Sequence, residues 1–467
     1  MVFSTYIFLF VYLPLTLGVY YLLPFRMRAF WLTLTSYVFY GWMRPEYCTL
    51  LAAATLLNYY CGKRMVRAQT ETSRKVWLTV AVAGSLGLLG FYKYAGMFTH
   101  WADTVAQLFV TPANGVNVIP ILDIILPIGI SFFTFQAISY PIDLYRGDAE
   151  EAPDLISFAS YISMFPQLIA GPIVRYQWIA EELKFRTHTP AKFALGLRFF
   201  AHGLAKKVLL ADMFALAVPL AFCEGQPTFE LAWIGILGYT LQIYFDFAGY
   251  SDMAVGLGLM MGFTYPQNFN SPYKSASITE FWRRWHITLS TWLRDYLYIP
   301  LGGNRKGAAR TYINLTIVML LGGLWHGASI VFMLWGLWHG LLLASERWLE
   351  DKHPLKRMPR PLAVACTNLL VILSWVLFRA ENFRMAGRIL KGMFLSFPTF
   401  ALGDALISPG LLLAIPIGMA ICLFAPNSWE ISPKQTPVLA MRDAAILLAA
   451  VTAVLATAST PFLYFQF

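Results

Sequence analysis

The chain has 467 residues, of which 58% are hydrophobic and only 13% are charged, and its formal net charge is +10. Soluble domains contain about 45–50% apolar and about 25% charged residues, so this composition excludes a soluble globular protein. No soluble basic domain is visible that could bind nucleic acid, and we expect the excess positive charge to lie in cytoplasmic loops.

The apolar runs are long and continuous, unlike the alternating segments of about ten residues that form membrane barrels. They predict an all-α polytopic membrane protein with about 11 to 13 crossings. The first run has no cationic segment or cleavage site typical of a signal peptide, so we expect it to be retained. No linker or internal repeat divides the chain, which predicts one membrane domain over residues 1–467. The candidate spans are residues 5–24, 28–43, 46–62, 76–98, 121–142, 154–174, 191–222, 230–262, 311–346 (expected to form two), 361–379, 406–425 and 445–465.

The loops predict the orientation of the first spans. Residues 62–75 carry five Lys and Arg residues and are expected in the cytoplasm, whereas residues 100–120 carry none and are expected on the opposite side. Beyond about residue 150, basic residues flank both ends of many segments. This pattern indicates re-entrant or in-plane pieces.

Residues 275–303 predict one such in-plane helix. Ser277 and Glu280 have the spacing of a capping box at its start, and Pro300 follows its end. At about 100° per residue, one face is apolar and the other charged, as in helices that lie in the membrane interface. The apolar stripe is Phe281, Trp282, Trp285, Leu289, Trp292, Leu293 and Tyr296, and the opposite face carries Arg283, Arg284, Arg294 and Asp295.

Three histidines, His286, His326 and His339, lie in apolar surroundings. Ionisable groups at membrane depth are functional candidates because their burial costs free energy, but each could equally be a packing histidine bonded to a neighbouring helix. Glycines 322, 323 and 327 around His326 allow either close helix packing or room for a substrate.

Two acidic residues, Asp246 and Asp252, lie in a Gly-rich apolar stretch and need partners. A carboxylate there could orient a histidine or form a structural ion pair. The five cysteines are scattered without the spacing of a metal site, so no metal is expected. Phosphate-binding loops, serine nucleophile elbows and metalloprotease motifs are not visible.

Seven sequence blocks stand out: "PIGISFFTFQAISYPIDLYRG" (127–147), "PQLIAGPIVRY" (166–176), "YFDFAGYSDMAVGLGLMMGF" (244–263), "TEFWRRWHITLSTWLRDYLYIPLGGNRKG" (279–307), "LLGGLWHGAS" (320–329), "WVLFRAENF" (375–383) and "PFLYFQF" (461–467). Together they resemble the membrane-bound O-acyltransferase (MBOAT) family, in its branch that acetylates bacterial exopolysaccharides. The resemblance covers nearly the whole chain.

The resemblance implies a ring of helices around a thinned centre with a tunnel. It implies that His326 is the catalytic histidine, acting as general base, and that His286 is the second catalytic-site histidine and orients a substrate. The expected substrate-binding residues are Trp325, Asp246, Arg283 and Arg284. The last two belong to a basic rim with Arg294, Arg305 and Lys306, which suits the phosphates of a CoA donor.

The function implied is an O-acetyltransferase subunit of the bacterial inner membrane. Its donor would be cytosolic acetyl-CoA, with no permanently bound cofactor, and its partner a periplasmic SGNH-type acetyltransferase subunit. That partner would acetylate an exopolysaccharide, alginate or cellulose, within a synthesis and export complex surrounded by membrane lipids. From the residues alone, a transporter or channel and a non-catalytic scaffold of an export complex remain open.

Overall fold

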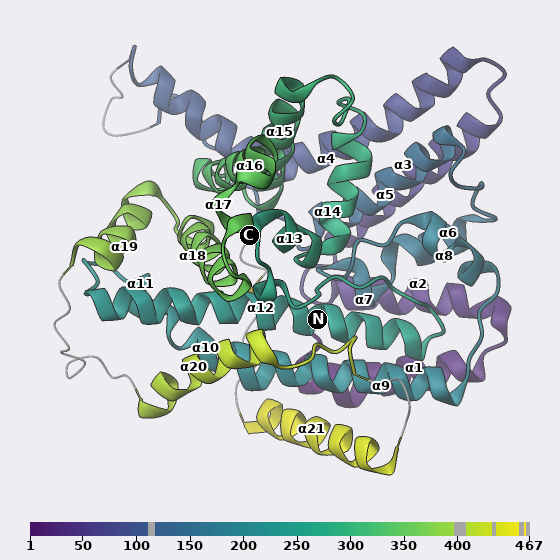
Figure 1. Cartoon of the computed structure of the whole chain (residues 1–467). Coiled ribbons are helices and arrows are strands. Elements are labelled where there is room, and N and C mark those ends of the chain that lie inside the picture. The colour runs from purple at the N-terminus through teal and green to yellow at the C-terminus, as the bar shows by residue number, and fades with distance from the viewer. Residues whose placement is uncertain (111–116, 397–407, 432–435, 457–461, 464–467) are drawn as a thin grey trace.

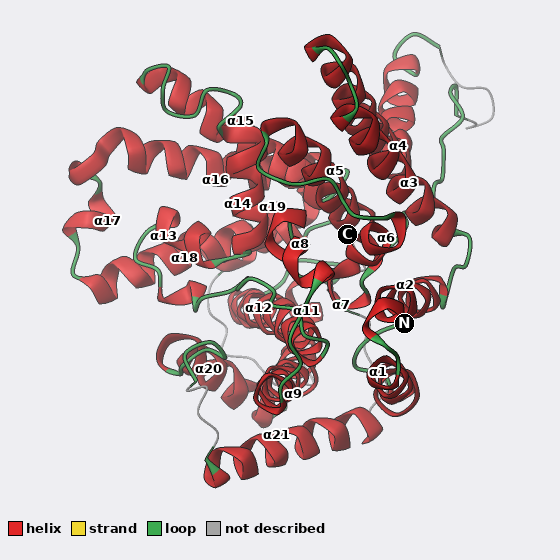
Figure 2. Cartoon of the chain, turned by 90° about the vertical axis from the view of Figure 1, so that its right-hand side faces the viewer, coloured by secondary structure: helices red, strands yellow, loops and turns green. Residues whose placement is uncertain are grey.

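A computed structural model describes residues 1–110, 117–396, 408–431, 436–456 and 462–463. All regular elements in these ranges are helical (Figure 2), so the prediction of an all-α protein is confirmed. Parts of four expected segments lie outside the described residues: 111–116 of the loop 100–120, 406–407 of the span 406–425, 457–461 and 464–465 of the span 445–465, and 461 and 464–467 of the terminal motif.

The helices are of very unequal length. In chain order they are α1 (Leu13–Leu22), α2 (Phe25–Gly41), α3 (Tyr47–Val66), α4 (Glu71–Ala106), α5 (Ile130–Arg146), α6 (Leu155–Ser163), α7 (Phe165–Leu168), α8 (Tyr176–Lys184), α9 (Pro190–Ala205), α10 (Asp212–Ala215), α11 (Val218–Ala221), α12 (Phe229–Met260), α13 (Ile278–Arg284), α14 (Ile287–Leu293), α15 (Ala308–His326), α16 (Ile330–Leu349), α17 (Pro354–Arg357), α18 (Arg360–Arg379), α19 (Phe383–Leu395), α20 (Pro409–Phe424) and α21 (Pro437–Ala456). π-Helical stretches occur at Phe8–Tyr12, Lys206–Ala211 and Arg294–Tyr298.

Four of the described helices are long and apolar enough to cross a membrane: α4, α12, α18 and α21. The segment Phe8–Leu22 and α20 are apolar but shorter. The expected spans 230–262 and 361–379 each form one helix, and 311–346 forms two, as predicted. The number of membrane crossings stays a prediction.

Three expected spans are wrong as continuous helices. In 191–222, α10 ends at Ala215 and a turn precedes the short α11, which begins at Val218. Within 121–142, helix α5 begins only at Ile130, after Gly129 adopts a left-handed φ of 78°. Within 154–174, α6 ends at Ser163 and the short α7 follows with Pro166 in its first turn. Proline has no N–H to continue the helical hydrogen bonds across this point, so this segment cannot be a single span.

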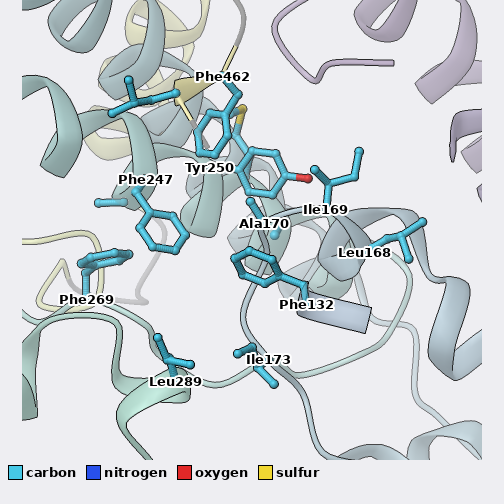
Figure 3. Packing of buried hydrophobic residues seen from close by; sticks show 14 of the residues in the cluster. Phe132, Leu168, Ile169, Ala170, Ile173, Phe247, Tyr250, Phe269, Leu289 and Phe462 are labelled. Carbon is cyan, nitrogen blue, oxygen red and sulfur yellow. The ribbon is translucent and has the colours of Figure 1, made fainter. Parts of the chain in front are cut away.

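Helix α12 runs through the centre of the molecule, with α9 packed along it and α21 outside α9 (Figures 1 and 2). Paired glycines explain the close contact between α9 and α12. A Cβ on Gly203 would lie 2.5 Å from the carbonyl oxygen of Gly249, and one on Gly256 would lie 2.5 Å from that of Gly196. Small residues that let helix backbones approach are common at such interfaces. In the core beside α12, Tyr250 packs against Phe462 at 4.6 Å between ring centroids (Figure 3).

The prediction of one continuous in-plane helix is wrong, although its amphipathic pattern is confirmed. The helix breaks between α13 and α14, where His286 adopts a left-handed φ of 43°. The break occurs because a loop residue, Asn268, accepts the hydrogen bond of Ile287 N–H on its carbonyl, at 2.9 Å, and that of Thr288 N–H on its side chain, at 3.2 Å. All seven residues of the predicted apolar stripe are buried, while Arg283 and Arg294 are exposed.

The predicted cap of this segment is present. The hydroxyl of Ser277 accepts a hydrogen bond from Glu280 N–H at 3.0 Å. A second acceptor comes from α16, where the buried carboxylate of Glu346 accepts hydrogen bonds from the N–H groups of Ile278, at 2.6 Å, and Thr279, at 3.0 Å. Because a helix start leaves its first N–H groups without intrahelical partners, these two side chains fix where α13 begins and how it sits against α16.

Candidate active site

Helices α15 and α16 form a tightly packed antiparallel hairpin that presents His326 at its turn. A Cβ on Gly323 would lie 2.2 Å from the carbonyl oxygen of Phe332, and one on Gly336 would lie 2.2 Å from that of Met319. A Cβ on Gly327 would meet the ring of Phe332 at 2.1 Å. Of the two roles open for the glycines around His326, these contacts assign Gly323 and Gly327 to packing. His326 is the last residue of α15 and is 4% exposed.

The three candidate histidines lie in one row of aromatic rings. Trp325 contacts both His286, at 6.0 Å between ring centroids, and His326, at 4.9 Å. Trp335 in turn contacts His326 and His339, each at 5.1 Å. The fold therefore brings together the two histidines and the tryptophan expected in the site.

His286 is fully buried in an aromatic cage at the break between α13 and α14. Its Nδ1 lies 3.1 Å from the side-chain oxygen of Asn268. Its ring contacts Phe247 edge-on at 4.7 Å, and Phe247 lies beside Phe269 at 5.0 Å (Figure 3). The left-handed backbone turns the ring into the core, toward Trp325.

His339 has the environment of a packing histidine. Trp282 donates a hydrogen bond from Nε1 to His339 Nδ1 at 3.2 Å. The other ring nitrogen lies 3.0 Å from the hydroxyl of Ser374, which itself donates to the carbonyl of Val371. Both nitrogens are thus used within the protein, and this histidine links α13, α16 and α18.

The structure adds Lys93 of α4 to the site. Its ammonium group donates hydrogen bonds to the carbonyl oxygens of Trp325 and His326, the latter at 3.2 Å, and to the hydroxyl of Ser131 at 3.2 Å. The next residue, Tyr94, donates to the carbonyl of Leu324 at 2.8 Å. A lysine within the apolar run 76–98 was a visible signal, but its partner lies more than 200 residues away in the sequence.

The acidic residues of α12 are held in ion pairs. Asp246 is 1% exposed, lies 2.8 Å from the ammonium of Lys207 and accepts a hydrogen bond from Leu463 N–H at 2.8 Å. Asp252 lies 2.6 Å from the ammonium of Lys206. These contacts give Asp246 a structural role as a link between α12, the stretch after α9 and the chain end. They supply no support for the expected role in substrate binding.

A cavity of about 710 Å³ opens beside the row of rings, between the α13–α14 segment and the α15–α16 hairpin. Its floor includes Leu293, Val318 and Met319, and the described residues that line it include three arginines and no carboxylate. Arg283 and Arg294 were expected near the donor, whereas Arg347 of α16 was not. Trp282 lines the cavity and packs against Trp335 at 5.8 Å between ring centroids.

Arg284 does not line this cavity, and its side chain is bound to other groups. It forms an ion pair with Glu280 at 2.9 Å and donates to the carbonyl of Asn270 at 3.1 Å. Partial burial acts to raise the pKa of Glu280, but the N–H of Ala276 and the charge of Arg284 outweigh it and hold this pKa below its usual value. Arg284 therefore ties α13 to the preceding loop.

Comparison with known proteins gives the site its family. The sequence pattern of the membrane-bound O-acyltransferase family matches residues 148–378, which include both His286 and His326. The chain is 48% identical over 405 residues to a protein of Pseudomonas aeruginosa named probable alginate O-acetylase AlgI, covering 86% of this chain and 76% of that protein.

Two further relatives extend the match. A protein of Pseudomonas putida with the same name is 44% identical over 495 residues, and the match covers 100% of both chains. A peptidoglycan O-acetyltransferase of Helicobacter pylori is 38% identical over 431 residues, covering 84% of this chain and 80% of that protein. Buried histidines around Trp325, an arginine-lined cavity beside them and these matches lead to one conclusion: the chain is an acyltransferase that belongs to the membrane-bound O-acyltransferase family.

Proposed function

We propose that this acyltransferase takes the acetyl group of cytosolic acetyl-CoA and passes it to an acceptor on the periplasmic side of the bacterial inner membrane. The acceptor belongs to a periplasmic SGNH-type partner subunit that acetylates an exopolysaccharide. The observation that carries the proposal is that the rings of His286 and His326 both contact the ring of Trp325, next to the arginine-lined cavity. Enzyme chemistry accounts for this arrangement better than a transport or scaffold role, since it joins candidate acid–base groups to a charged ligand cavity.

The cavity suits the donor. Arg283, Arg294 and Arg347 line it, and guanidinium groups bind phosphate oxygens in pairs of charge-assisted hydrogen bonds. The apolar floor of the cavity suits the pantetheine arm that carries the thioester. Trp282 lines the cavity and packs against Trp335, which contacts His326. We therefore propose that the thioester of a donor bound there lies on the side of the cavity that faces the row of rings.

In the reaction, His326 acts as general base. It takes the proton of the acceptor hydroxyl while the hydroxyl oxygen attacks the carbonyl carbon of the thioester. The bond from that carbon to sulfur then breaks, the acetyl ester forms, and the thiolate of CoA leaves and takes the proton from His326, which becomes neutral again. A general base contributes about 10²- to 10⁴-fold to such a step. Lys93 supports it by holding the carbonyl of His326 at 3.2 Å.

Alginate is the polymer we favour as the final acceptor. The relative of Pseudomonas putida, whose name refers to alginate, matches this chain over the full length of both proteins. Cellulose is a second candidate from the branch resemblance. Peptidoglycan is a third, since a relative at 38% identity is named for it.

A directional assay tests the proposal. The protein is reconstituted in inside-out vesicles with a periplasmic SGNH-type subunit in the lumen, and acetyl-CoA labelled in the acetyl group is added outside. We expect label on the luminal subunit, and on alginate supplied with it. Label that stays in acetyl-CoA, with protein of normal abundance, would contradict the proposed donor or partner. Omitting the membrane protein is the control.

A further inference from the structure

Asn268 makes contacts that set the hydrogen-bonding state of His286. It lies in the loop between α12 and α13 and is 1% exposed. Its side-chain oxygen Oδ1 accepts hydrogen bonds from Thr288 N–H, at 3.2 Å, and from the Thr288 hydroxyl, at 2.9 Å. Its Nδ2 donates to the hydroxyl of Ser251 at 3.0 Å.

The orientation of this amide follows from Thr288. A backbone N–H can only donate, so the side-chain atom of Asn268 that faces it must be the oxygen. That same oxygen lies 3.1 Å from His286 Nδ1. Since an amide oxygen only accepts, Nδ1 must carry a proton. A neutral imidazole carries one ring proton, so Nε2 of His286 is left with its lone pair.

The ring is neutral because of where it lies. It is fully buried and packs against aromatic rings, including those of Phe132, Phe247 and Trp325. Among the described residues its side chain makes one hydrogen bond, to Asn268, and Nε2 has no partner. A buried cation without a counter-charge costs far more than a neutral ring. Even a neutral buried nitrogen costs free energy when its hydrogen bond is not made.

We propose that Asn268 is a positioning residue that locks His286 in the Nδ1–H form, so that Nε2 receives the hydroxyl of the acyl acceptor. The thioester carbonyl and sulfur of the donor have no proton to give, so a lone pair cannot hold them. His286 therefore orients the acceptor, not the donor, while His326 takes the proton. This assignment rests on the proposed function. It adds that His286 binds the acceptor hydroxyl and that His326 removes the proton of that hydroxyl.

The chain offers a matched set of variants. Asn268→Leu removes the acceptor for His286 Nδ1 and, with it, the acceptor for the N–H and hydroxyl of Thr288. Ser251→Ala removes only the hydrogen bond on the other side of the amide and is the control. Asn268→Asp keeps an oxygen at the same place, and it is assayed at mildly alkaline pH so that His286 stays neutral beside the new carboxylate. His286→Gln and the double variant Asn268→Leu/His286→Gln complete a cycle.

Each purified variant is assayed for acetyl transfer with acetyl-CoA and acceptor concentrations varied separately. We expect Asn268→Leu to lose about 10- to 100-fold in transfer, by analogy with the loss when the partner that orients a metal-ligating histidine is removed. The loss should fall on kcat and on the KM for the acceptor, while the KM for acetyl-CoA stays unchanged. Ser251→Ala and Asn268→Asp should keep most of the activity, and the double variant should be no worse than His286→Gln alone.

The outcomes separate two failures. If the wild-type protein transfers no acetyl group, the proposed function fails. If the wild type is active but the losses of Asn268→Leu and His286→Gln add in the double variant, or if the KM for acetyl-CoA rises, the assignment of Asn268 and His286 fails. Should Asn268→Leu not accumulate, Asn268→Asp decides: a loss as large as that of His286→Gln contradicts the positioning role.

Discussion

The ammonium group of Lys93 donates a hydrogen bond to the carbonyl oxygen of His326 at 3.2 Å. It also reaches the carbonyl of Trp325, so one side chain of α4 binds the last two carbonyls of α15. The carboxyl end of a helix carries partial negative charge and carbonyls without intrahelical partners. The hydrogen bonds of Lys93 to Ser131, Trp325 and His326 tie α4 to the turn on which His326 is presented.

Replacing this contact should reduce catalysis more than donor binding. We expect Lys93→Met to lower kcat by roughly tenfold or more, because a buried polar group left without its hydrogen bond costs about 1–3 kcal/mol and the loss of this contact frees the end of α15. The KM for acetyl-CoA should stay near the wild-type value. Tyr94→Phe removes the neighbouring hydrogen bond to Leu324 and is the control, with a smaller effect. Wild-type kcat in Lys93→Met would show that this contact does not position His326.

Two adjacent glycines should respond very differently to the same substitution. Gly323→Ala would place a Cβ 2.2 Å from the carbonyl oxygen of Phe332, against the backbone of α16, whereas Gly322→Ala meets only a methyl group of Leu293 at 3.3 Å. We expect Gly323→Ala to lose most of its folded protein and Gly322→Ala to accumulate normally. Abundance after detergent extraction and gel filtration measures this. Equal accumulation of both variants would mean that α15 and α16 are not packed this closely.

The arginines should divide according to their contacts. Arg283→Gln and Arg294→Gln remove charges that line the cavity, so we expect normal abundance and a raised KM for acetyl-CoA. That effect should shrink at high salt, which screens exposed charges. Arg284→Gln breaks the ion pair with Glu280 and should instead reduce abundance. If Arg284→Gln raises the KM and Arg283→Gln does not, the donor lies on the other face of α13.

The orientation of α4 has its own test. Helix α4 has 36 residues and joins the basic turn after α3 to the loop expected on the opposite side. In a background without native cysteines, a single cysteine in place of Arg67 should be labelled only from the cytoplasm. One in place of Leu108, which is 78% exposed, should be labelled from the periplasm in intact cells. Labelling of the cysteine at 108 only after permeabilisation would reverse this topology.

Parts of the fold follow from local pattern. The burial of Trp285, Trp292 and their neighbours was predictable because apolar residues recur with the helical period in both α13 and α14, on either side of the break at His286. The break itself was not, because it depends on Asn268, a residue from a separate loop that accepts two hydrogen bonds from the start of α14. The length of 154–174 suggested a span, although Pro166 argued against it.

Some residues of the site could be predicted from their type, but the contacts between them could not. His286 and His326 stood out as ionisable groups in apolar runs, and the fold places both against Trp325. Lys207 as the partner of Asp246, and Lys93 as the partner of His326, are contacts between distant segments. Local sequence carries no information about which buried charge meets which carbonyl or carboxylate.

The most direct test of the account compares the wild-type protein with His326→Gln in the transfer of label from acetyl-CoA to the acceptor. Glutamine fills part of the ring's place among Trp325, Trp335 and Phe378 but cannot act as a general base. We expect the variant to accumulate, to bind acetyl-CoA with wild-type affinity and to transfer acetyl groups about 10²- to 10⁴-fold more slowly. Transfer at the wild-type rate by folded His326→Gln would contradict the account.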